Sequence, residues 1–159
     1  MSPTYAANTS VSVESSRGEI ERTLQRYGAT SFAYGWDQSR ALIEFAAHER
    51  RVRFVLTLPD RNAPQFTRTP SRGHARSEVQ ALAEWEKACR QRWRALALVV
   101  KAKLEAVEAG ISEFEDEFLA HIVLPDGSTA GQWLRPQIAD AYATGSMPAM
   151  LPALGRGGT

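Results

Sequence analysis

The side chains best suited to catalysis in this chain are three histidines and one cysteine. His48, His74 and His121 are scattered, and none has a second histidine, cysteine or carboxylate at metal-ligand spacing on one element. Cys89, the only cysteine, lies on the apolar stripe of a predicted helix, which favours a core residue over a reactive thiol. The chain also lacks a phosphate-binding glycine loop and a Gly-x-Ser-x-Gly elbow. We therefore predict no catalytic residues, no cofactor and no enzymatic activity.

A run of acids could bind a metal ion. Glu113 and Glu117 stand one helical turn apart, with Glu115 and Asp116 between them, so two carboxylates could share a divalent cation. Acids near the positive N-terminus of a helix are also favourable without any metal. We favour a solvated helix face, or one that meets basic residues of the long helix or of a neighbouring subunit, and predict no metal site. An unrecognised metal-dependent enzyme remains a third hypothesis.

Positively charged side chains recur on three successive segments, and they could form one groove for a phosphate backbone if the helix crosses the sheet beside the loop. Tyr34, Trp36 and Trp93 could add stacking surfaces. The alternative is that the arginines solubilise exposed faces while the aromatic rings lie in the core. The predicted nucleic-acid-binding residues are Arg51 and Arg53 on a strand, Arg61, Arg68, Arg72 and Arg76 in the next loop, and Lys87, Arg90, Arg94 and Lys101 on a helix.

One long helix must position much of this set. No proline or glycine interrupts the chain from Ser77 to Gly110, and apolar residues recur there at helical spacing. Ser77 with Gln80 fits a capping box, and Gly110 fits the residue just past the helix end.

Three strands precede this helix. Phe32, Tyr34 and Trp36 alternate with small residues, and a second strand is expected over 41–47. His48-Glu49 is short enough for a hairpin, and a third strand follows over 51–58. Tight turns between consecutive strands predict an antiparallel meander packed on the long helix. The predicted fold class is α+β.

Shorter helices complete the predicted fold. An N-terminal helix should begin at Ser16, which forms a capping box with Glu19, after a short edge strand at Val11 and Val13. Two C-terminal helices should begin near Ser112 and Thr129, each with a capping pattern, and Pro136 should end or kink the second helix before Gly145 closes it. Pro125-Asp126-Gly127 predicts a turn between these two helices.

Length and composition indicate one domain over residues 1–159, with a flexible N-terminus (1–12), a mobile basic loop (59–76) and a C-terminal tail (146–159). The net charge of +1 excludes a global field that would attract nucleic acid or an anionic membrane, so any electrostatic function must rest on local patches. The N-terminus shows no secretory signal, and the longest apolar run, Ala95 to Val100, is too short for a membrane span. These features predict a soluble, cytoplasmic protein without a membrane partner.

The region from Arg92 to Leu154 resembles small proteins encoded in tailed phages and prophages. The residues that carry the resemblance include Leu-Ala-Leu-Val-Val-Lys-Ala-Lys-Leu-Glu-Ala-Val-Glu-Ala-Gly-Ile, Phe-Glu-Asp-Glu-Phe-Leu and Val-Leu-Pro-Asp-Gly. The resemblance implies no assigned activity and no catalytic residues. Separately, the order of one helix, three antiparallel strands and a long helix is similar in topology to the core of single-strand annealing recombinases, which is an analogy of fold alone.

Two principal hypotheses follow. The first is a non-enzymatic phage-type protein that binds single-stranded nucleic acid through the basic groove, as a homo-oligomer and in a recombination or annealing-like role in the host cytoplasm. The second is a phage-encoded protein–protein interaction module, such as an inhibitor of a host factor or an assembly accessory. Sequence alone does not distinguish DNA, RNA or protein as the partner.

Overall fold

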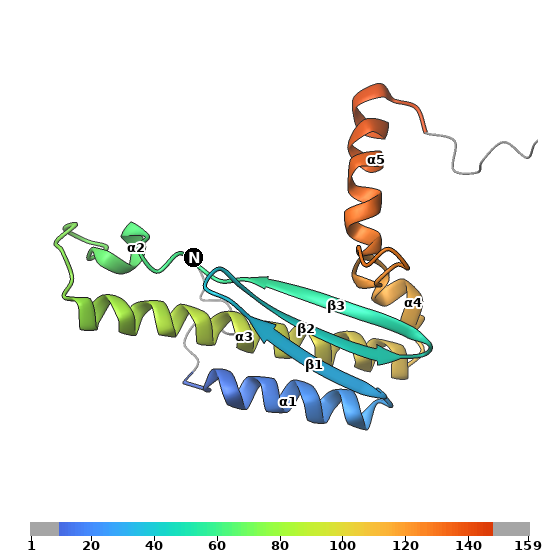
Figure 1. Ribbon diagram of the computed structural model, residues 1–159, viewed down its shortest axis with the longest axis horizontal. Coiled ribbons are helices and arrows are strands. Elements are labelled where there is room, and N and C mark those ends of the chain that lie inside the picture. The colour runs from blue at the N-terminus through green and yellow to red at the C-terminus, as the bar shows by residue number, and fades with distance from the viewer. Residues whose placement is uncertain (1–9, 148–159) are drawn as a thin grey trace, which may run out of the picture.

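A computed structural model describes residues 10–147, and Figure 1 shows an α+β fold built from one sheet and helices of very different length. The predicted flexible N-terminus and C-terminal tail lie largely outside these residues. The elements are α1 (Val13–Arg26), β1 (Ser31–Trp36), β2 (Arg40–Ala47), β3 (Arg50–Thr57), α2 (Pro64–Thr67), α3 (Glu78–Glu108), α4 (Phe114–Glu117), the 3₁₀ turn η1 (Leu119–His121) and α5 (Ala130–Thr144).

The long helix α3 has the predicted bounds and the predicted cap. The Ser77 hydroxyl accepts a hydrogen bond from the Gln80 N–H, and the Gln80 side chain accepts one from the Ser77 N–H, each at 3.2 Å. Gly110 has a φ of 74°, in the left-handed region that a glycine enters without a Cβ clash. Both ends of α3 are therefore specified locally.

The sheet is the predicted antiparallel meander, in the order β1-β2-β3. Asp37 closes the first hairpin, because its carboxylate accepts from the backbone N–H groups of Ser39 and Arg40 at 2.7 and 2.9 Å. The second hairpin turns at His48 and Glu49, whose φ angles are 50° and 61°. Two consecutive left-handed residues match the right-handed twist of the flanking strands, which fits the two-residue connection expected there.

The core lies between one face of the sheet and the helices α1 and α3. Alternate residues of β2 and β3 point into it, and the face of α3 that carries Trp93 and Val100 packs against them. Phe118 is fully buried and makes edge-to-face contacts with Phe45 and Phe54, at centroid distances of 5.8 and 6.2 Å. The segment containing α4 and η1 thus completes the core under the sheet.

Two predicted helix starts are wrong. α1 begins at Val13 rather than Ser16, because Ser12 is its N-cap and accepts from the Ser15 N–H at 3.1 Å. The predicted edge strand at Val11 and Val13 is consequently absent. α4 begins after Glu113 with no side-chain cap, so the Ser112–Glu115 pattern does not form a capping box.

The basic loop over 59–76 contains more regular structure than its prolines suggest. It includes the short helix α2, whose Phe66 is buried, and an isolated antiparallel bridge between Arg68 and Ala75. α2 packs against α3. The burial of Phe66 helps to dock a segment whose sequence predicts an irregular loop.

The last helix, α5, projects from the rest of the molecule (Figure 1). Thr129 and Gln132 form the predicted capping box, and Gly145 ends the helix with a φ of 69°. Of the two predicted effects of Pro136, ending or kinking the helix, the first does not occur, since α5 continues to Thr144. The helix packs mainly on η1, where Gly131 lies so close that an added Cβ would stand 2.8 Å from the Ala120 carbonyl oxygen.

None of the helices within residues 10–147 combines the length and the apolar character needed to cross a membrane.

Candidate binding cleft

The predicted strand arginines lie on the face of the sheet that points away from α1 and α3. Arg51 and Arg53 alternate with the core residues Val52 and Phe54, and both pair with Glu44 of β2. The Glu44 carboxylate accepts from the Nε atoms of Arg51 and Arg53 at 2.9 and 3.0 Å. Burial raises the pKa of Glu44, but these hydrogen bonds outweigh it and keep the pKa below its ordinary value. The two arginines are therefore already neutralised in part.

Two of the four loop arginines stabilise the loop itself. Arg68 donates to the Gly73 carbonyl at 3.0 Å, and Arg76 donates to the carbonyls of Gln65 and Phe66 at 3.1 and 3.2 Å. Arg72 is exposed. Arg61 differs, since its guanidinium lies 5.9 Å from the ring centroid of Trp85 on α3.

The basic residues of α3 lie on the helix side of the fold. Arg94 forms an ion pair with Glu19 of α1. Lys101 lines a hollow of about 310 Å³ between α1 and α3, together with Arg22 and Arg26. Arg90 lines a much larger cleft, and Lys87 lies three residues before it. The ten predicted residues therefore do not form one groove, because the sheet and its core separate Arg51 and Arg53 from α3.

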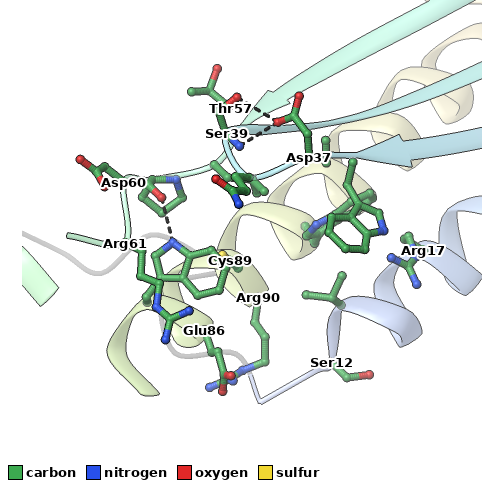
Figure 2. A pocket seen from close by; sticks show the side chains of 18 of the residues that line it. Ser12, Arg17, Asp37, Ser39, Thr57, Asp60, Arg61, Glu86, Cys89 and Arg90 are labelled. Carbon is green, nitrogen blue, oxygen red and sulfur yellow. Dashed lines mark hydrogen bonds between the residues drawn. The ribbon is translucent and has the colours of Figure 1, made fainter. Parts of the chain in front are cut away.

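The larger cleft, of about 1,030 Å³, lies between the β1–β2 hairpin, the start of α1, the segment after β3 and the first half of α3. We call it the hairpin–helix cleft (Figure 2). Its lining includes Arg17, Trp36, Arg61, Trp85, Arg90 and Trp93. A cleft of this size is ample for a ligand of several rings.

Aromatic rings and arginines alternate around this cleft. Trp36, on the last residue of β1, is 73% exposed, whereas Trp93 is buried at the floor. The Arg17 guanidinium stands 4.3 Å from the ring centroid of Tyr34 and 5.7 Å from that of Trp93. Trp85 is held in place because its indole N–H donates to the Pro59 carbonyl at 2.8 Å. The exposed Trp36 ring thus shares one cleft with arginines that contact other aromatic rings.

Arg90 carries a buried hydrogen-bond donor in this cleft that lacks an acceptor among the residues that the structure describes. Its Nε is buried, and among residues 10–147 no atom accepts a hydrogen bond from it. A buried donor of this kind costs free energy unless it is satisfied. An anionic ligand would supply the missing acceptor once the Arg90 side chain turned to expose this N–H to the cleft.

Acids also line the cleft, but two of them are committed to turns. The hydrogen bonds that Asp37 accepts from the backbone and hydroxyl of Ser39 lower its pKa. Asp60 accepts from the Asn62 N–H at 2.9 Å. Glu14 and Glu86 complete the acidic set, so an anion would be held by local arginine contacts rather than by a positive field.

The histidines, the cysteine and the acidic run do not form a metal centre. Within residues 10–147, no group of three or more His, Cys, Asp or Glu side chains could hold a metal ion. Cys89 lies at the cleft floor, where burial raises its pKa. Glu117 binds Lys103 of α3 at 3.0 Å, and Glu115 lies 3.7 Å from Arg50.

The sequence indicated only part of the cleft. Arg61, Arg90, Trp36 and Trp93 were among the expected residues, and the structure brings them to one place. Arg17 and Trp85 were not expected there. Trp85 lies on the apolar stripe of α3, a position that predicts a core residue. The sequence around Arg17 predicts an ordinary residue on a helix surface.

The fold and the cleft define an α+β protein with a cleft lined by arginines and tryptophans. Comparison of the chain with protein-family models, curated proteins and solved structures found no match.

Proposed function

We propose that this chain is a non-enzymatic, phage-type protein that binds single-stranded nucleic acid in the hairpin–helix cleft, in an annealing-like role in the host cytoplasm. The observation that carries the proposal is that the exposed Trp36 ring and three arginines line one cleft, and that one of these arginines, Arg90, has a buried and unpartnered Nε. Tryptophan offers a stacking face for a base, and arginine offers donors for the phosphates on either side.

The arrangement favours a single strand over a duplex. In a duplex the faces of the bases are stacked on each other and are unavailable to Trp36, whereas an unpaired base can rotate onto the indole. With Arg17, Arg61 and Arg90 as phosphate contacts, the logarithm of affinity for a single strand should fall with the logarithm of salt concentration at a slope of about −2.

The test is binding of a fluorescent oligonucleotide, single- and double-stranded, across a salt series. Trp36→Ala should weaken single-strand binding by about tenfold or more, since a base–aromatic stack contributes about 1–3 kcal/mol. Arg90→Gln should weaken binding and make the salt slope shallower by about 0.7.

Arg51→Gln provides the matched control. It removes the same charge from the outer face of the sheet, where Arg51 already pairs with Glu44, and it should leave affinity and slope nearly unchanged. If Arg51→Gln weakens binding as much as Arg90→Gln, the interface lies on the outer face of the sheet instead. No single-strand binding at low salt would refute the proposal.

A second candidate, a protein-interaction module, is favoured by α5. Its exposed apolar residues Trp133, Ile138 and Tyr142 are 57%, 52% and 87% exposed, and Leu134 lies partly buried between them. Leu134, Ile138 and Tyr142 follow each other at spacings of four residues and so lie along one side of the helix, whereas Trp133 lies on another side. We propose that α5 uses this apolar side to self-associate into a homo-oligomer.

A further inference from the structure

β1 is an edge strand whose outer side is open. The Asp37 N–H donates to the Arg40 carbonyl, so Asp37 and Arg40 form a hydrogen-bonded pair at the end of the β1–β2 ladder. Hydrogen-bonded pairs alternate along an antiparallel ladder, and Ala33 and Gly35 therefore direct their backbone groups toward β2. Phe32, Tyr34 and Trp36 consequently direct their N–H and C=O groups away from the sheet. Among residues 10–147, no backbone hydrogen bond reaches these outward groups.

The opposite edge of the sheet is protected, which makes the contrast informative. The Val123 N–H donates to the Arg51 carbonyl at 2.8 Å, and Ile122 forms an isolated bridge with Val52, so a short segment covers part of β3. Arg51 and Arg53 also place charges along that edge. β1 has no charge and no proline among its six residues, and such unprotected edges readily accept another strand.

The two faces of β1 differ in a way that suits an added strand. On the outer face Ser31 and Ala33 have small side chains and Gly35 has none, so they would not obstruct a neighbour. Tyr34 and Trp36 stand on the other face, 51% and 73% exposed, beside the helix α1. An added strand would bury both rings by cross-strand contact.

α1 forms the floor beneath this position, on the side of the sheet that α3 also covers (Figure 1). Arg17 of α1 reaches Tyr34, and Glu14 and Glu21 stand three residues before and four after it, on the same side of the helix. Both glutamates are exposed, and within the described part of the chain neither forms an ion pair. A side chain pointing from an added strand toward α1 would meet these two carboxylates, with Arg17 between them and its guanidinium over the Tyr34 ring.

We propose that β1 accepts an extended segment of a partner protein as a fourth strand, with a lysine or arginine of that segment facing Glu14 and Glu21. Main-chain hydrogen bonds to Phe32, Tyr34 and Trp36 supply the affinity, and alternate side chains supply the specificity. This interaction does not depend on the nucleic-acid binding proposed above.

A second copy of the chain fits this edge less well than a single extended segment. Pairing β1 with β1 about a two-fold axis keeps the same face of both sheets on one side. Each copy would then bring its own α1 to the space beneath the joined strands, where the first α1 already lies. An extended segment brings no helix with it.

The probe is a blocked synthetic peptide, Thr-Val-Thr-Lys-Thr-Val-Thr, whose valines and lysine form one row. Amide hydrogen exchange of the full chain is measured by NMR with and without the peptide and without any oligonucleotide. Saturating peptide should slow exchange of the Phe32, Tyr34 and Trp36 amides by about tenfold or more, because each becomes hydrogen-bonded. The same peptide N-methylated at the two valines and the lysine should give no protection, and glutamate in place of lysine should weaken it.

Variants of the chain supply the remaining arms. Tyr34→Pro removes one outward N–H without touching the ladder to β2 and should abolish protection, whereas Tyr34→Ala keeps the N–H and should retain it. Arg61→Gln, aimed at the nucleic-acid site, should leave peptide binding unchanged.

Three results would overturn the inference. The first is that the N-methylated peptide binds as tightly as the unmodified one. The second is that millimolar peptide does not protect the Phe32, Tyr34 and Trp36 amides. The third is that the chain forms a dimer without peptide and that Tyr34→Pro dissociates this dimer. The last result would assign the edge to a second copy. The peptide arms remain decisive even if Tyr34→Pro fails to fold.

Discussion

His121 links the charge state of one side chain to the stability of the fold. Its ring stacks on Phe54 at a centroid distance of 4.0 Å and is half-buried. Burial lowers its pKa below the ordinary value of 6.5, the nearby Lys103 ammonium lowers it further, and a hydrogen bond with the Arg53 backbone opposes this shift. The folded protein therefore favours the neutral imidazole.

The sign of the pH dependence follows from this shift. Between the folded and unfolded pKa values of His121 the unfolded chain binds more protons, so stability decreases as pH falls below about 6.5. Urea unfolding at pH 7.5, 6.5 and 5.5 should show this loss in the wild type. His121→Phe keeps a ring on Phe54 without a titrating group and should show a smaller loss. Parallel pH curves for the two proteins would contradict the assignment to His121.

Residue type alone indicated which side chains can bind a nucleic acid but not which ones meet. The sequence gives no reason to distinguish Arg51, Arg61 and Arg90 as phosphate contacts. In the structure, however, Arg51 pairs with Glu44, while the other two line the cleft. That difference is set by the phase of β3 and by the packing of α3. The role of Arg17 depends on contacts between α1 and β1, which no local pattern encodes.

Helix caps show how far local sequence decides an element. Ser77 and Ser112 both precede a Gln or Glu by three residues, but only Ser77 makes both capping hydrogen bonds. Ser77→Ala should therefore lower the free energy of unfolding by about 1 kcal/mol, and Ser112→Ala should change it by less than about 0.5 kcal/mol. Chemical denaturation of both variants tests this contrast, and equal losses would show that the capping geometry of Ser77 contributes nothing.

The elements predicted correctly are those with a complete local signal. β1, β2 and β3 show alternation bounded by turn residues, and α3 shows a long stripe with a signal at each end. The errors arose where several signals competed. Ser12 and Ser16 both resemble caps at the start of α1. The prolines between β3 and α3 predicted an irregular loop, so the short helix α2, whose Phe66 is buried, was not expected.

The whole molecule consists of a two-layer body and a projecting arm. The body carries the hairpin–helix cleft and the open edge of β1, which meet at Trp36. A strand added to β1 would cover part of Trp36, so peptide and nucleic acid would compete for this residue if both proposals hold. The arm, α5, lies at the other end of the sheet (Figure 1), and its surface is independent of both.

The proposed self-association through α5 can be tested by changing one residue of the helix. The helix has only Arg135 and Asp140 as charged residues, and packing of its apolar side against a second α5 would remove that side from water. Ile138→Glu would place a charge in the centre of such an interface. We expect the wild type to dimerise with increasing concentration in sedimentation experiments, and Ile138→Glu to weaken the dimer by at least about tenfold.

The control separates an interface effect from a folding effect. Because Ile138 is 52% exposed, its replacement should leave the unfolding midpoint of the monomer nearly unchanged. Asp140→Asn, on the opposite side of the helix, should leave the dimer intact.

Two linked cleft-bearing bodies would bind a long strand more tightly than either body alone, since the second contact is intramolecular. A long oligonucleotide should therefore lose more affinity than a short one when Ile138→Glu is introduced, and equal losses would show that α5 does not couple two clefts.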